Sequence, residues 1–159
     1  RGLVRVANHL GAGVLENPAL MAYLPQLSHA LLGQPLLLPQ PRTWWCGDPD
    51  SLEEVRRRLD ALLVKPATNW HGLQTIVAGD LSDTERATLE ADIARTPHHF
   101  TAQEIVVSST APTLDPTGAV APRPAVLRTF AVADHDSYTV MPGGLGMLVM
   151  LVTPSMVPK

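Results

Sequence analysis

Leu62-Leu63-Val64-Lys65-Pro66 is the stretch of sequence that decides the fold expected for this chain. A continuous apolar run of this length predicts a buried strand, and the proline behind the lysine predicts that ladder pairing stops there. Lys65 would then lie at a strand terminus, where a side chain can reach into a cleft. Its ammonium group suits phosphate oxygens, whereas the common alternative is an exposed lysine that only improves solubility.

Length and composition indicate one soluble globular domain. The chain has 159 residues, of which 45% are hydrophobic and 17% charged, which is enough apolar content for a buried core. The formal net charge of -3 argues against a nucleic-acid partner. The only basic run, Arg56–Arg58, lies in a helical stretch rich in Glu and Asp, which favours a solvated helix face.

The cysteine count and the apolar segments bear on location. Cys46 is the single cysteine, so an internal disulfide is impossible and a cytoplasmic location is expected. No signal peptide opens the chain, and the apolar tail at 146–152 is too short to span a bilayer, so no membrane partner is expected. The chain lacks an initiator Met and begins inside an expected strand, so we expect a piece of a longer protein.

Three helices are expected around the strand at 62–66. Apolar spacing predicts a helix over 17–33, which Pro25 divides because proline cannot continue a helix. A second helix begins with Asp50 or Ser51 as its cap and leads into the strand. The pattern Ser82-x-x-Glu85 is a capping box that opens the third helix.

Further strands surround residues 62–66 in sequence. Trp44 and Trp45 are adjacent on an extended segment, so one is expected in the core and the other on a neighbouring surface. Residues 75–78 and 100–107 are expected strands, residues 108–124 a surface loop rich in Ser, Thr, Pro and Gly, and residues 128–141 a hairpin.

The strand at 100–107 carries Gln103 and Glu104 in its middle. A carboxylate buried in a strand is costly unless it is paired or faces a cleft, which leaves two interpretations open. In one, this is an edge strand with Glu104 in water. In the other, the strand lines a nucleotide pocket and offers backbone groups to a base edge and Glu104 to a hydroxyl group. His98 and His99 are adjacent and cannot both face one ion, so no metal site is expected within the chain.

An ordered set of short motifs between Arg5 and Leu145 resembles the circularly permuted ATP-grasp proteins, a family related to glutathionylspermidine synthase. No single motif is decisive, and the specificity lies in their order and spacing. The motifs are Asn8-x-Leu10-Gly11-x-Gly13, Glu16-Asn17-Pro18-Ala19-Leu20, Pro41-x-Thr43-Trp44, Leu63-Val64-Lys65-Pro66, Ala102-Gln103-Glu104, Ser109-Thr110-Ala111-Pro112, Pro122-Arg123, Leu127-Arg128 and Val140-Met141-Pro142-Gly143-Gly144-Leu145.

The resemblance implies an α+β, ATP-grasp-like fold, with antiparallel or mixed sheets and flanking helices, of which this chain holds an incomplete part. Residues 1–60 would be a helical and strand segment of one lobe and residues 61–159 the core strands, with no clear independent second domain. The implied function is the ATP-binding core of an ATP-dependent carboxylate–amine ligase that forms peptide bonds through an acyl phosphate. The implied partners are therefore a carboxylate and an amine, either small molecules or peptides, while the oligomeric state is left open.

The resemblance also implies roles for particular residues. Lys65 would hold ATP phosphate oxygens, Gln103, Glu104 and Ile105 would form the adenine and ribose hinge, and Arg128 would act in catalysis beside the phosphates or the carboxylate. Mg²⁺ would accompany ATP, with its ligands expected outside this chain because relatives carry them upstream of the first motif. Relatives also continue Met-Pro-Gly-Gly-Leu with Thr-Arg, which Gly146-Met147 replaces here. The alternative function is therefore a non-catalytic remnant or interaction module.

Overall fold

In a computed structural model of the protein, which describes residues 11–67, 74–114 and 117–148, the stretch Leu62–Pro66 forms strand β2. β2 lies inside a four-stranded antiparallel sheet of order β1-β4-β2-β3, together with β1 (Thr43–Trp45), β3 (Ile76–Val77) and β4 (Phe100–Glu104). The expected buried strand is confirmed, since Leu62 and Val64 are buried.

Pairing of β2 continues one residue further than the sequence predicted. Pro66 lies opposite Phe100, and the N–H of Ala67 donates to the carbonyl of His99 at 2.7 Å. Backbone groups of successive strand residues alternate in direction, so the missing N–H of Pro66 is on the side away from β4. β3 ends its pairing at Val64, and the proline therefore removes no ladder bond.

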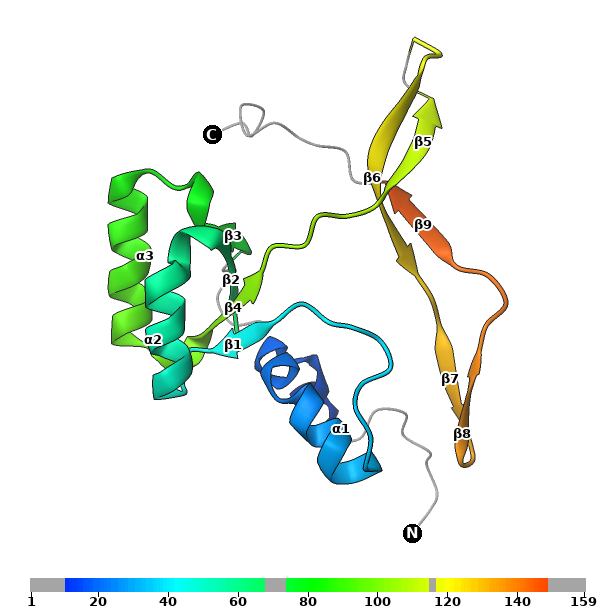
Figure 1. Ribbon diagram of the computed structural model, residues 1–159, viewed down its shortest axis with the longest axis horizontal. Helices are drawn as coiled ribbons and strands as arrows, with labels where there is room; N and C mark the ends of the chain where they lie inside the picture. The colour runs from blue at the N-terminus through cyan, green and yellow to red at the C-terminus, as the bar shows by residue number, and fades with distance from the viewer. Residues whose placement is uncertain (1–10, 68–73, 115–116, 149–159) are drawn as a thin grey trace. The chain divides into compact units, whose positions relative to one another are not determined.

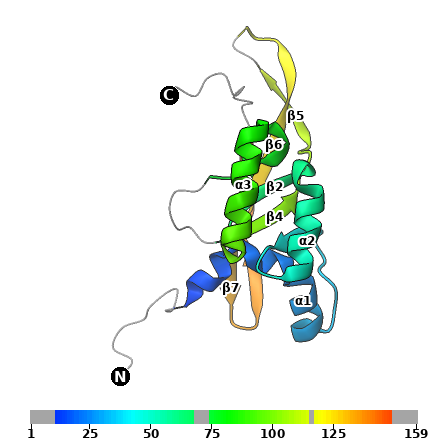
Figure 2. The same ribbon diagram turned by 90° about the vertical axis from the view of Figure 1, so that its left-hand side faces the viewer.

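Helices α2 (Pro49–Arg58) and α3 (Asp83–Arg95) cover one face of this sheet (Figure 2). The buried core lies between them and the strands, because alternate strand residues direct apolar side chains to this face. The core consists of Trp44, Cys46, Val55, Leu59, Leu62, Val64, Ala78, Leu89, Ile93, Phe100 and Ala102.

The helix ends follow local sequence rules. The capping box of Ser82 and Glu85 is confirmed at the start of α3. The cap of α2 is Asp48, whose Oδ2 accepts a hydrogen bond from the N–H of Ser51 at 2.9 Å, so the expected cap at Asp50 or Ser51 was wrong. Asp48 is the cap because the proline after it fits the first position of the helix.

The opposite face of the sheet is partly covered by the short 3-10 helix η2 (Pro18–Ala22), which contacts β1 and β4, and α1 (Leu24–Leu32) packs beside η2. The expected division of this helix is confirmed, since Pro25 stands in the first turn of α1 and Gly33, with φ 68°, ends it. The remaining 3-10 helices are η1 (Ala12–Glu16), η3 (Leu59–Ala61), η4 (Ala78–Asp80) and η5 (Pro97–His99).

The chain separates into two compact units, Arg1–Val106 and Val107–Lys159. This division lies later than the one expected near residue 60, since β1 pairs with β4 inside the first unit. In the second unit, β5 (Thr110–Leu114), β6 (Val120–Arg128) and β9 (Leu145–Leu148) form an antiparallel sheet, and β7 (Ala131–Asp134) pairs with β8 (Ser137–Val140) (Figure 1).

The sequence prediction of a surface loop over 108–124 was wrong, because β5 and the first half of β6 occupy it. Pro112 and Pro122 lie opposite each other in this ladder. Among the described residues, the first half of β6 pairs with β5 alone and the second half with β9 alone. Each half therefore has a side without a described partner, where a proline removes no bond. The expected turn before Ser137 is confirmed, with His135 at φ 51°.

The described parts of the chain hold no helix that is both long enough and apolar enough to cross a bilayer. Together, the helices and antiparallel sheets confirm the expected α+β fold class.

Candidate functional site

Lys65 and Gln103 meet on the sheet face opposite α2 and α3. Their strands are neighbours, with Lys65 opposite Thr101 and Gln103 opposite Leu63. The ammonium Nζ of Lys65 donates to the amide Oε1 of Gln103 at 2.7 Å, and Gln103 is only 7% exposed. The family resemblance implied contacts of Lys65 with the phosphates and of Gln103 with the adenine and ribose, whereas the structure brings the two side chains into direct contact.

Thr43 extends this polar cluster onto β1. The amide Nε2 of Gln103 donates to the hydroxyl Oγ1 of Thr43 at 3.1 Å, and Met21 of η2 contributes its sulfur at 3.8 Å from the same nitrogen. The amide group of Gln103 is therefore fixed in orientation, with its oxygen toward Lys65 and its nitrogen toward Thr43. Sequence reasoning quoted Thr43 only as part of a motif and gave it no role.

The charge on Lys65 is not compensated within the part of the chain that the structure describes. Its hydrogen-bond partner is a neutral amide, and the salt bridges of this region join other cations. Lys65 is also the only lysine among the described residues. A half-buried ammonium group whose hydrogen-bond partner among the described residues is a neutral amide favours binding of an anion.

Glu104 belongs to a different environment from Gln103. Its carboxylate Oε1 lies 3.6 Å from Nη2 of Arg58, on the face covered by α2. Arg58 in turn lies over the ring of Trp44 at 5.3 Å and bonds Glu54. The arginine orients the Glu104 carboxylate away from Lys65, so the expected role of Glu104 toward a ligand hydroxyl stays a prediction.

Two sequence interpretations change here. The edge-strand interpretation of residues 100–107 was wrong, because β4 lies between β1 and β2. The basic run at 56–58 is not uniformly solvated either. Arg57 is exposed and paired with Glu54, whereas Arg58 turns inward to Trp44 and Glu104.

The chain leaves the sheet directly after Glu104. The N–H of Glu104 donates to the carbonyl of Arg42 at 2.9 Å, and the ladder with β2 ends at the pair of Leu62 and Glu104. Ile105 follows outside any described strand, with 48% of its surface exposed. The boundary between the two compact units comes one residue later, after Val106. Residues 104–106 are thus both the end of a strand and the link between units.

Arg128 lies in the second unit, as the last residue of β6. It is exposed and pairs in register with Leu145. Gly144 explains part of the nearby motif, because a Cβ at this position would stand 2.9 Å from the carbonyl oxygen of Arg128. Gly143 has a φ of 103°, which favours glycine as well. The two glycines thus shape the connection that returns the chain beside Arg128.

Metal ligands do not gather in the described ranges, where no three His, Cys, Asp or Glu side chains come together as an ion would require. His98 and His99 stack edge to face with their ring centroids 4.2 Å apart.

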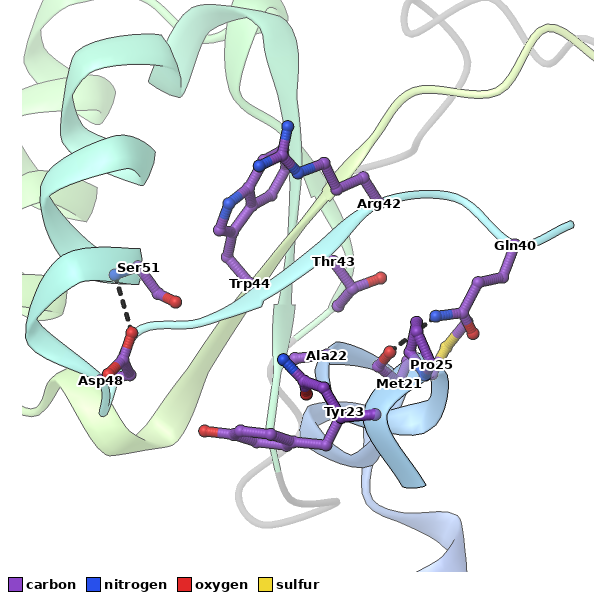
Figure 3. Close-up of a pocket in the computed structure, with 11 residues that line it drawn as sticks. Met21, Ala22, Tyr23, Pro25, Gln40, Arg42, Thr43, Trp44, Asp48 and Ser51 are labelled. Atoms are coloured by element: carbon purple, nitrogen blue, oxygen red, sulfur yellow. Dashed lines mark hydrogen bonds between the residues drawn. The ribbon is translucent and has the colours of Figure 1, made fainter. Parts of the chain in front are cut away.

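A pocket of about 560 Å³ lies beside the polar cluster, and sequence reasoning did not identify it. Thr43 belongs to both, and Arg42, Trp44 and Asp48 line the pocket with residues of η2 and α1 (Figure 3). The signal that could have found it is the motif Pro41-x-Thr43-Trp44, whose polar residue alternates with a buried aromatic one.

Comparison of the sequence with known proteins identifies a family. The family described as circularly permuted ATP-grasp type 2 matches residues 1–148. Uncharacterized protein Rv2567 of Mycobacterium tuberculosis is 35% identical over 149 residues, which are 94% of this chain and 16% of that protein. Uncharacterized protein Rv2411c of the same species is 31% identical over 150 residues, which are 94% of this chain and 27% of that protein.

A third relative carries a functional name. A protein of Frankia alni named "Putative glutamate--cysteine ligase 2-3" is 32% identical over 112 residues, which are 70% of this chain and 13% of that protein. The chain thus spans about a sixth of the length of Rv2567 and little more than a quarter of Rv2411c. The match over nearly the whole chain shows that it belongs to the circularly permuted ATP-grasp type 2 family.

Proposed function

We propose that this chain is the ATP-binding part of an ATP-dependent carboxylate–amine ligase. The observation that carries the proposal is the contact of Lys65 with Gln103, which places an ammonium group without an acidic partner in the described residues beside the strand end where the chain passes between units. Family membership and the name of the Frankia relative support the ligase class.

Each residue has a chemical task in this proposal. Lys65 neutralises phosphate oxygens as a point charge, and Gln103 holds the ammonium group in place. The carbonyl of Glu104 and the backbone groups of Ile105 are offered to the adenine edge, because the ladder with β2 ends at Glu104, whose N–H already bonds Arg42. Arg128 acts on the phosphates or the substrate carboxylate from the second unit. Phosphoryl transfer depends chiefly on such positioning and charge neutralisation.

The reaction that we propose proceeds through an acyl phosphate. A carboxylate oxygen attacks the terminal phosphorus of ATP and ADP leaves, and an amine then attacks the acyl carbon and releases phosphate. Mg²⁺ would accompany ATP and neutralise part of the phosphate charge, as the family resemblance implies. Residues of the whole protein beyond this chain would also determine which carboxylate and which amine react.

The lysine content offers a direct test. An ATP derivative that carries an acyl group on its terminal phosphate acylates a nearby amine, and Lys65 and Lys159 are the only two lysines of the chain. We expect labelling of Lys65, found by peptide mapping, that excess ATP prevents. Labelling of Lys159 alone, or labelling that ATP does not prevent, would contradict the proposal.

Thermal shift with Mg-ATP provides the equilibrium measurement. Bound ligand stabilises the folded chain by about 2.7 kcal/mol at a hundredfold excess over Kd. We expect this stabilisation to fall for Lys65→Ala and Arg128→Ala and to persist for Arg95→Ala, which removes an exposed guanidinium paired with Asp92 on α3. Equal stabilisation of all the variants would leave Lys65 and Arg128 without a role in nucleotide binding.

A further inference from the structure

The pocket of about 560 Å³ follows the open edge of β1. β1 is an end strand of its sheet, so among the described residues no strand pairs with its outer side. Residues of η2 and α1 form one wall, and the start of α2 forms the other. Figure 3 shows this edge running between Arg42 and Asp48, with Thr43 and Trp44 between them.

Hydrogen-bonding direction identifies the groups on the open edge. The carbonyl of Arg42 accepts a bond from the N–H of Glu104, so Arg42 directs its backbone toward β4. Successive residues of a strand direct their backbone groups to alternate sides. The N–H and C=O of Thr43 therefore point outward along the pocket, as a donor and an acceptor for a second extended backbone.

Opposite charges stand at the two ends of this edge. Arg42, at the beginning, lies over the ring of Trp44 at 5.0 Å, and none of the described carboxylates forms an ion pair with it. Asp48, after the end of β1, is half-buried. Hydrogen bonds from the side chain and backbone of Ser51 lower the pKa of the Asp48 carboxyl, which favours its ionised form.

An extended peptide satisfies all of these groups in one orientation. A strand that pairs antiparallel with β1 has its amino end beside the last residue of β1 and its carboxyl end beside the first. That orientation brings a free amino group to Asp48 and a free carboxylate to Arg42, whereas a parallel strand would meet like charges. An internal segment of a long chain would bring no opposite charge to Arg42 or Asp48, which favours a short peptide with free ends.

We propose that this pocket binds a short zwitterionic peptide, about the three residues of β1 in length, as an additional antiparallel strand. The pocket adjoins the polar cluster of Lys65 and Gln103 at Thr43, whose hydroxyl accepts the hydrogen bond from Gln103. As the binding site of a ligase substrate, the pocket rests on the proposed function. Peptide binding itself requires no nucleotide, so it can be tested separately.

The test is a titration of the chain, labelled with ¹⁵N, with trialanine, N-acetyl-trialanine and trialanine amide in the absence of ATP. We expect saturable shifts of the Thr43 and Trp45 amide signals with trialanine. Each blocked peptide should bind about tenfold more weakly, because it lacks one charge-assisted hydrogen bond. Absence of saturable shifts, or equal affinities for the three peptides, would overturn the proposal.

Two conservative variants test whether Asp48 binds the amino end of the peptide and Arg42 its carboxyl end. Asp48→Asn keeps a good helix cap and should bind trialanine and N-acetyl-trialanine equally. Arg42→Gln should bind trialanine and its amide equally, and the control Arg95→Gln on α3 should keep both preferences. Preferences that persist in the pocket variants would overturn the assignment.

A parallel titration with Mg-ATP separates the two proposals. Loss of ATP binding in Lys65→Ala with trialanine binding intact supports independent sites. If the unsubstituted chain binds ATP but no peptide, only the peptide proposal fails. If it binds the peptide but no ATP, only the proposed function fails.

Discussion

Gln103 joins three parts of the first unit through one side chain. Its amide bonds Lys65 of β2 and Thr43 of β1 and lies near Met21 of η2. The identity of Lys65 and Gln103 as a pair followed from the family motifs. Their direct contact did not, because sequence spacing does not reveal which strands are neighbours.

We expect Gln103→Leu to lower the free energy of unfolding by about 1–3 kcal/mol, since it leaves polar partners without an acceptor and a donor. Thr43→Val should cost less, because Gln103 keeps its bond to Lys65. Urea denaturation measures both changes. The control is Thr113→Val, whose hydroxyl bonds only Ala111 in the second unit and should change stability by about 0.5 kcal/mol or less. A cost for Gln103→Leu no larger than the control would contradict a structural role for the amide.

Cys46 provides a pH-dependent prediction at the same scale. Burial raises the pKa of its thiol from 9.0 to about 11, and the residue is 1% exposed. The folded state favours the neutral thiol. The stabilisation of the fold by this protonated thiol is therefore complete below pH 9 and is lost as the pH rises through 11. The difference between the two pKa values corresponds to roughly 3 kcal/mol of unfolding free energy.

Unfolding free energies measured between pH 8 and pH 11 should therefore fall less steeply in Cys46→Ala than in the unsubstituted chain. The thiol should also react slowly with a disulfide reagent until the chain is unfolded. Parallel pH profiles for the two proteins would show that the thiol does not titrate in this range.

At the scale of single elements, local signals predicted helix ends better than strands. The capping box at Ser82 and the division at Pro25 are properties of a few neighbouring residues, so the sequence predicts them. β5 was missed because Pro112 is a turn signal in isolation. It is compatible with a strand only where a side is open, which depends on partners distant in sequence.

The cap of α3 should contribute measurably to stability. Ser82→Ala removes the acceptor of the Glu85 N–H, and we expect a loss of about 1 kcal/mol in urea denaturation. Hydrogen bonds from Ser82 lower the pKa of Glu85, so their stabilisation is lost as the pH falls below the ordinary value of 4.5.

The matched control for this cap is Thr88→Ala, in the middle of the same helix. Its hydroxyl bonds only the carbonyl of Thr84, and alanine is the better helix former, so this variant should be neutral or slightly more stable. Equal losses in Ser82→Ala and Thr88→Ala would show that the cap adds nothing specific.

For the whole molecule, the decisive feature is the link at 104–106. The family resemblance implies a nucleotide hinge at Gln103, Glu104 and Ile105, and the boundary between the two compact units falls just after these residues. The motif order supplied this expectation, whereas composition gave only one domain. Composition does not predict the pairing of β1 with β4, which joins residues distant in sequence within the first unit.

The proposed nucleotide contacts come from both units, Lys65 from the first and Arg128 from the second, so the length of the link should matter. We expect insertion of two glycines after Val107 to leave the unfolding of the first unit unchanged, since Val107 is 93% exposed. Affinity for Mg-ATP, measured by calorimetry, should fall at least about tenfold, because in this proposal one nucleotide contacts Lys65 and Arg128 at once. The control places the same insertion after His135, in the exposed turn between β7 and β8, and should retain affinity. Unchanged affinity in the link variant would mean that one unit binds the nucleotide alone.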